Sequence, residues 1–187
     1  DKVEVIDKDS YFNKPHVHDS FIVFTGYTTE NTENGIYCYD INNKTEIPIC
    51  TNKSKHTNPC IYEDCIVWQD YRHNNISSIY MYNLSTSEEK RIFPSEQHQL
   101  SPRIWGDNII WIENGTMMLY NISNNEVRTL RQGNSPEMWG DHIIFIAFRY
   151  GISIFEISTN TTYHLNDKII ELNPDFDESD VRQFNYR

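Results

Sequence analysis

Positive charge, long apolar runs and helical periodicity are all scarce in this chain of 187 residues. It carries 16 lysine and arginine residues against 27 acidic ones, which gives a formal net charge of −11. Proteins that bind a nucleic acid backbone or an anionic membrane surface need a basic patch, so this balance argues against both partners. No apolar run approaches the roughly 20 residues of a membrane-spanning helix, which argues against direct membrane insertion. No signal peptide is visible, and removal of a leader or a preceding domain ahead of Asp1 would be compatible with the sequence.

The familiar catalytic signatures are missing as well. The sequence contains no G-x-S-x-G nucleophile elbow, no C-x-x-C pair, no P-loop and no H-E-x-x-H zinc motif. We therefore expect a protein without a catalytic site of its own.

A fourfold repeat fills most of the chain. A proline opens each copy, at Pro15, Pro59, Pro102 and Pro136, and a large aromatic residue follows nine positions later, at Phe24, Trp68, Trp111 and Phe145. A second aromatic series, Tyr39, Tyr82, Tyr120 and Phe155, is followed ten positions later by Ile49, Ile92, Leu130 and Leu165. A period of about 40 residues with four short strands per unit is the signature of propeller blades. The sequence thus predicts an all-β fold, a β-propeller built from four-stranded blades.

The repeats set the expected boundaries. Four full copies span about 11–50, 55–93, 97–130 and 133–165. Residues 1–6 resemble the outer strand of a blade, and 173–187 resemble the first two strands of a fifth one, with an acidic tail as the alternative. The chain is therefore either a single small propeller, 1–187, whose first strand completes the fifth blade, or a segment of a larger propeller.

The strands differ in polarity within each copy. The second strands (FIVF, CIVW, NIIW and HIIF) are nearly continuous apolar runs, which predicts strands covered on both faces by the neighbouring blades. The fourth strands are more polar, and one contains Pro48, which is tolerated only at a sheet edge. The G-D and E-D pairs between the first and second strands predict tight hairpins.

These repeats resemble the TolB-like propeller repeats of bacterial and archaeal cell-surface and periplasmic proteins. NPCIYEDCIVWQDYR followed by IYMYNLST carries the likeness, with weaker copies at SPRIWGDNIIW and SPEMWGDHIIF. The D-x-R element of that family is present only as Asp70 and Arg72. The resemblance implies a scaffold or interaction module of the cell surface, such as a surface-layer or adhesion protein. The alternative is a non-catalytic propeller that gates or positions substrate for a hydrolase domain outside these residues.

The loops between second and third strands are the expected interaction surface, because tyrosine and arginine are enriched at binding hot spots. Asp70 and Arg72 have an alternative role as an ion pair within their own loop. The predicted binding rim comprises Tyr27, Asp70, Tyr71, Arg72, Arg149 and Tyr150.

Cysteine and asparagine bear on the compartment. Cys38, Cys50, Cys60 and Cys65 fit one or two disulfides or buried free thiols, and a metal site is the weaker interpretation. Seven N-x-S/T acceptor sites suggest a glycosylated, exported protein in an extracellular, cell-surface or periplasmic location, although asparagine is also an ordinary turn residue. The acceptors are Asn43, Asn52, Asn75, Asn83, Asn114, Asn121 and Asn160.

Metal-binding patterns are weak, and no cofactor is predicted. His16 and His18 share one strand face but have no evident third ligand. Asp175, Asp177, Glu178 and Asp180 offer oxygen ligands for calcium without the rest of a calcium loop. The expected partners are a protein or a cell-surface glycan, with self-assembly or further blades of the same chain as additional possibilities.

Overall fold

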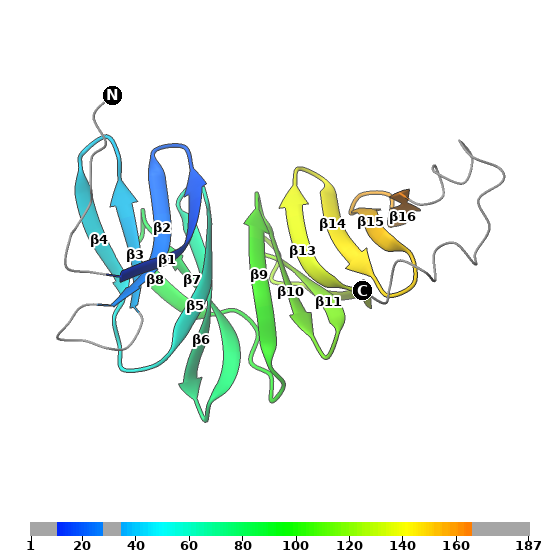
Figure 1. Ribbon diagram of the computed structural model, residues 1–187, viewed down its shortest axis with the longest axis horizontal. Coiled ribbons are helices and arrows are strands. Elements are labelled where there is room, and N and C mark those ends of the chain that lie inside the picture. Colours follow the sequence, from blue (N-terminus) through cyan, green and yellow to red (C-terminus); the bar gives the residue numbers. More distant parts are fainter. Residues whose placement is uncertain (1–10, 28–34, 166–187) are drawn as a thin grey trace.

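The computed structural model describes residues 11–27 and 35–165. Sixteen strands in these residues form four antiparallel sheets of four strands, and neighbours in each sheet are neighbours in the chain. Each sheet is one propeller blade, and the blades succeed one another in chain order across the molecule (Figure 1). The all-β propeller prediction is confirmed. The segments 1–6 and 173–187, including the acidic residues considered for calcium, lie outside the described residues.

The strand bounds are as follows. Blade 1 comprises β1 (Tyr11–His18), β2 (Phe21–Tyr27), β3 (Gly35–Asp40) and β4 (Thr45–Cys50). Blade 2 comprises β5 (His56–Tyr62), β6 (Cys65–His73), β7 (Ile76–Asn83) and β8 (Glu88–Arg91). Blade 3 comprises β9 (Gln99–Trp105), β10 (Asn108–Glu113), β11 (Thr116–Asn121) and β12 (Val127–Gln132). Blade 4 comprises β13 (Asn134–Trp139), β14 (His142–Ala147), β15 (Gly151–Glu156) and β16 (Thr161–His164).

A tight hairpin joins the first two strands of every blade, as predicted. The turn residues Asp19, Glu63, Gly106 and Gly140 all have a positive φ, between 48° and 57°. Two-residue turns with a positive φ match the right-handed twist of the strands that they connect. The acidic and glycine residues seen in the sequence are therefore explained by turn geometry.

The blade proline marks a bulge in each first strand. The residue before it has a positive φ in all four blades, at Lys14, Asn58, Ser101 and Ser135. The pairing between first and second strands shifts at the same point. Because proline has no N–H to donate, it fits a place where the ladder is already interrupted.

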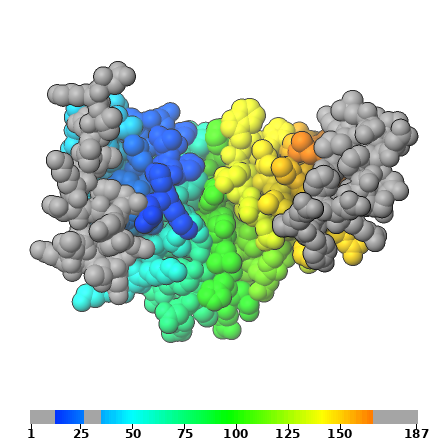
Figure 2. Space-filling model, in the orientation of Figure 1, coloured from blue at the N-terminus to red at the C-terminus, as the bar shows by residue number. Residues whose placement is uncertain are grey.

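The core lies between blades. One apolar cluster joins blades 1 and 2, a second joins blades 2 and 3, and a third joins blades 3 and 4. Trp68, Trp111 and Phe145, from the second strands, are fully buried in these layers. Figure 2 shows the same stacking, with the blades packed directly on one another in chain order.

The prediction that the second strands are buried on both faces is correct for β6 and β10 but wrong for β14. In β14, buried residues alternate with exposed ones, and Ile144 and Ile146 face outward. The reason is positional: blade 4 is the last described blade, so no described blade covers its far face. Within the described residues no helix is long and apolar enough to cross a membrane.

Candidate functional site

The six predicted rim residues differ in their surroundings. Tyr27 is the last residue of β2. Asp70 is fully buried, and Tyr71 and Arg72 beside it are half-buried. Arg149 and Tyr150 line a pocket at the end of blade 4. The structure therefore separates a buried polar network in blade 2 from an open pocket in blade 4.

The network in blade 2 is built around the Asp70 carboxylate. The Arg72 guanidinium donates to Asp70 Oδ2 over 2.6 Å and 2.9 Å, and the Trp68 indole Nε1 donates to it over 3.1 Å. His56 Nε2 lies 3.2 Å from the same oxygen, and both His56 and Asp70 are completely inaccessible to solvent. The ion pair that the sequence suggested between Asp70 and Arg72 is confirmed.

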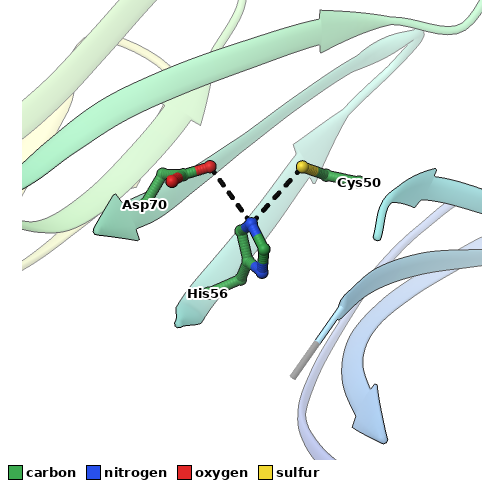
Figure 3. Close-up of side chains that lie close together, drawn as sticks. All are labelled: Cys50, His56 and Asp70. Atoms are coloured by element: carbon green, nitrogen blue, oxygen red, sulfur yellow. Dashed lines mark hydrogen bonds and ion pairs between the residues drawn. The ribbon is translucent and has the colours of Figure 1, made fainter. Parts of the chain in front are cut away.

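Cys50 approaches the same network from the preceding blade (Figure 3). Its Sγ lies 3.4 Å from His56 Nε2 and accepts from Arg72 Nη2 over 3.1 Å. Ligand-type atoms of Cys50, His56 and Asp70 all lie within 4.8 Å of one another, the spacing of a metal site. However, Arg72 already presents its positive charge to both the sulfur and the carboxylate, so a divalent ion would meet a fixed cation.

The same three side chains are not arranged for nucleophilic catalysis. A nucleophile and the acid that orients the base must contact different nitrogens of the histidine ring. Here Cys50 and Asp70 both contact Nε2 of His56. We therefore interpret the network as a structural connection between the last strand of blade 1 and the first two strands of blade 2.

The pKa of Asp70 reflects this connection. Burial alone would raise it, but hydrogen bonds from His56 and Arg72 outweigh burial and hold the pKa well below its ordinary value of 3.8. The pKa of Arg72 is raised for the matching reason, since its bonds to Asp70 and Glu89 outweigh burial. Asp70 is thus a permanently charged anion at neutral pH.

A pH dependence of stability follows. A carboxylate whose pKa is depressed on folding stabilises the native state fully above its unfolded pKa and loses that contribution as the pH falls toward its folded pKa. We expect the urea midpoint of the wild-type protein to fall below about pH 4, approaching that of Asp70→Asn. Urea unfolding of both proteins between neutral and strongly acidic pH measures this. A gap between them that stays constant through the acid range would contradict the prediction.

Blade 3 repeats the arrangement with different residues. Asp70 stands eleven positions after its blade proline, and Glu113 occupies that position in blade 3. Trp111 Nε1 donates to Glu113 over 3.3 Å, as Trp68 does to Asp70 over 3.1 Å. Gln99, which stands where blade 2 has His56, donates to Glu113 over 3.2 Å. An acid that accepts the tryptophan N–H and binds a second polar side chain is therefore common to both blades.

In blade 4, a pocket of about 390 Å³ lies where blades 2 and 3 have the acid and the tryptophan. Ala147 replaces the acid, Phe145 replaces the tryptophan, and Gly133 replaces the histidine or glutamine. A Cβ on Gly133 would collide with the Phe145 ring, so this position requires glycine. The pocket is lined by Arg131, Gln132, Phe145, Ala147, Phe148, Arg149, Tyr150 and His164.

The pocket lining contains two arginines, Arg131 and Arg149, and no acidic residue. The Arg131 guanidinium lies 5.2 Å from the centre of the Phe155 ring, and its buried Nε has no hydrogen-bond partner. His164 donates to or accepts from Ser153 Oγ over 2.7 Å and stacks on Tyr150 with ring centres 4.2 Å apart. The sequence predicted Arg149 and Tyr150, but not Arg131 or His164. Aligning the repeats eleven positions after each proline would have shown that blades 1 and 4 lack the acid, with Gly26 and Ala147 at that position.

The other predicted sites have structural explanations. All four cysteines are free thiols in the structure, and the disulfides suggested by the sequence stay a prediction. His16 Nδ1 accepts from Ile61 N over 3.3 Å, and His16 Nε2 lies 3.5 Å from Cys60 Sγ. The His18 ring contacts the Tyr62 ring in a tilted arrangement, with ring centres 4.5 Å apart. Burial lowers the pKa of His16. Both histidines therefore pack blade 1 on blade 2, and they do not belong to the described cluster with metal-site spacing.

The seven glycan acceptors divide into two groups. Asn83 and Asn121 are half-buried, and their side-chain oxygens accept from Thr86 N and Asn124 N in the turns that follow. These two fit the turn-residue alternative. The other five are exposed, namely Asn43, Asn52, Asn75, Asn114 and Asn160.

Comparison with known proteins shows the fold. No protein-family model and no curated protein matches the chain. Among solved structures, TolB from Acinetobacter baumannii matches with a TM-score of 0.67 and 20% identity, over 84% of this chain and 43% of that one. The β-propeller domain of the Trilobed protease from Pyrococcus furiosus matches with a TM-score of 0.63 and 16% identity, over 84% of this chain and 57% of that one. A puromycin-hydrolyzing peptidase from Mycobacterium tuberculosis matches with a TM-score of 0.66 and 9% identity, over 83% of this chain and 28% of that one. The chain thus spans less than two thirds of each of these proteins, and its fold is a TolB-like β-propeller fold.

Proposed function

We propose that this chain is a protein-interaction section of a propeller at the cell surface or in the cell envelope, with no catalytic site of its own. The observation that carries the proposal is the outer face of blade 4, the side of the sheet turned away from blade 3. Its exposed apolar residues are Ile144, Ile146, Ile152 and Tyr163. A contiguous apolar face of this kind on a soluble protein marks an interaction site.

Comparison with blade 3 shows how unusual this exposure is within the molecule. Ile110, Ile112 and Met117 are the repeat equivalents of Ile144, Ile146 and Ile152 and are 0%, 5% and 0% exposed, because blade 4 covers them. In blade 4 the same positions are 43%, 50% and 54% exposed. The side chains have the character of an interblade layer, so the occupant that fits them is another apolar sheet face. A further blade of the same repeat class, in this polypeptide or in a second copy, has that chemistry.

Composition supports the location. Five glycan acceptors are exposed, and the net charge of −11 disfavours nucleic acid and anionic lipid. A protein or a cell-surface glycan remains the proposed kind of partner outside the propeller.

Site-specific cross-linking tests the interaction surface. A photo-reactive amino acid at Ile146, in the natural full-length protein within its own cells, should give one discrete cross-linked product, because the apolar face is covered. The same group at Thr86, in an exposed turn of blade 2, is the matched control and should give none. Mass spectrometry of the product distinguishes a further blade, a second copy and a separate protein. If position 146 yields no more product than position 86, the face is not an interface.

A second function has a specific observation in its favour. Two of the similar structures are a protease propeller domain and a peptidase. The alternative is therefore a non-catalytic propeller that gates or positions substrate for a hydrolase domain outside these residues. The sequence of the full-length protein separates the two, since a hydrolase domain with a nucleophile elbow beside the propeller favours the alternative, and anchoring or further repeat domains favour the scaffold.

A further inference from the structure

The pocket in blade 4 has the surroundings of an acid site but lacks the acid. In blades 2 and 3, Asp70 and Glu113 are each held by a tryptophan N–H and by a second polar side chain. Blade 4 has neither the acid, the indole nor the second polar group, since Ala147, Phe145 and Gly133 stand at these positions. Blade 1 also lacks the acid and the indole, with Gly26 and Phe24 in their places. An open volume of about 390 Å³ lies beside Phe145 and Ala147.

The cationic side of the site is still present in blade 4. Arg149 stands at the repeat position of Arg72, the residue that pairs with Asp70 in blade 2. Arg131 stands at the position of Cys50, whose sulfur also contacts that network. Among the described residues neither Arg131 nor Arg149 forms an ion pair. Arg131 and Arg149 both line the pocket, so their guanidinium groups offer N–H donors to an acceptor there.

We propose that this pocket binds a carboxylate ligand at the place that Asp70 and Glu113 occupy in the preceding blades. The planar guanidinium of arginine matches a carboxylate through paired N–H donors, which favours this anion over a halide or a neutral amide. The Phe145, Phe148 and Tyr150 rings give the pocket apolar walls. The ligand class is therefore a small carboxylate with an apolar or aromatic body, or an acidic side chain of a peptide that presents the same group.

The first experiment uses phenylacetate as the probe and phenylacetamide as its uncharged isostere. Titration of the full 187-residue chain, followed by nuclear magnetic resonance of its arginine side chains, should show phenylacetate binding at least about tenfold more tightly than the amide. Arg149→Gln should weaken phenylacetate binding by about tenfold or more. Arg128→Gln is the matched control, because Arg128 is an exposed residue of β12 outside the pocket lining, and it should leave binding unchanged.

A second variant tests the origin of the pocket. Ala147→Asp restores the acid of blade 2 next to Arg149 and should abolish phenylacetate binding while the protein stays folded. Its thermal midpoint should rise or stay the same, because the new carboxylate meets unpaired guanidinium groups. This outcome separates occupation of the site from simple unfolding.

A pair of capped hexapeptides, one containing a single glutamate and its glutamine counterpart, then identifies the source of the carboxylate. Tighter binding of the glutamate peptide than of phenylacetate indicates a polypeptide source, and the reverse indicates a small molecule. The proposal is overturned if the acid and amide probes bind equally, if neither acid binds, or if Ala147→Asp binds phenylacetate as the wild type does. None of these results depends on whether the outer face of blade 4 is an interface.

Discussion

Replacing Asp70 with alanine is expected to destabilise the protein by about 3–5 kcal/mol, measured as the change in the free energy of unfolding in urea. The loss of the carboxylate leaves Arg72 without its buried partner and removes the acceptor for the Trp68 indole. Breaking a buried ion pair on one side is costly because the remaining charge stays desolvated. His56 and Asp70 are both fully buried, so water cannot replace the lost contact without opening the interface between blades.

Two further variants make this result specific. Asp70→Asn keeps the shape and one acceptor oxygen and should cost less than alanine. Glu137→Ala removes the partner of Arg103, an ion pair of similar geometry at 2.7 Å whose glutamate is mostly exposed. That change should cost about 1 kcal/mol or less, because solvent screens the pair. Equal losses for Asp70→Ala and Glu137→Ala would show that burial of the network is not what stabilises it.

The second large effect is expected from Ile110→Ala, with a loss of about 2–5 kcal/mol. Ile110 is fully buried in the cluster between blades 3 and 4, where it packs with Phe145 and Phe155. Deleting most of its side chain removes apolar contact and leaves a cavity between the two sheets. The sheets cannot close this cavity, because hydrogen bonds between their strands fix each backbone.

Ile144→Ala is the matched control for this prediction. It changes the same residue type at the same repeat position, but on the open face of blade 4, where 43% of the residue is exposed. In a monomeric chain it should cost well under 1 kcal/mol. Urea unfolding at low protein concentration measures both variants. A loss at Ile144 as large as that at Ile110 would mean that the open face is already covered in solution, and it would contradict the monomer as the reference state.

Both candidate functions make use of the same architecture. A propeller section presents its loops at the ends of the blades and its sheet faces only where a neighbour is missing. In this chain the pocket of blade 4 belongs to the first kind of surface, and the row of Ile144, Ile146 and Ile152 belongs to the second. They are separate features, which is why the cross-linking and ligand experiments test different claims.

The sequence by itself determined the fold and most of the local geometry. The proline-to-aromatic spacing predicted the blades, because a repeated supersecondary unit imposes the same pattern of buried positions on each copy. It predicted the hairpin turns, because a positive φ demands particular residues. It also predicted the Asp70–Arg72 pair, because two residues so close in one strand meet whatever surrounds them.

Only the tertiary structure decided what each blade contacts. Cys50 is separated from Asp70 by 20 positions and reaches its network only because blade 1 packs on blade 2. His56, 14 positions before Asp70, faces it across the β5–β6 ladder of blade 2. HIIF in β14 reads like NIIW in β10, yet one is half exposed and the other buried, since burial depends on whether a neighbouring blade is present. The pocket in blade 4 likewise depends on side chains from separate strands that meet at one place in space, such as Arg131, Ala147 and His164. The pattern of apolar residues in a strand indicates which of its faces could be buried, and only the packing of neighbouring blades decides which faces are covered.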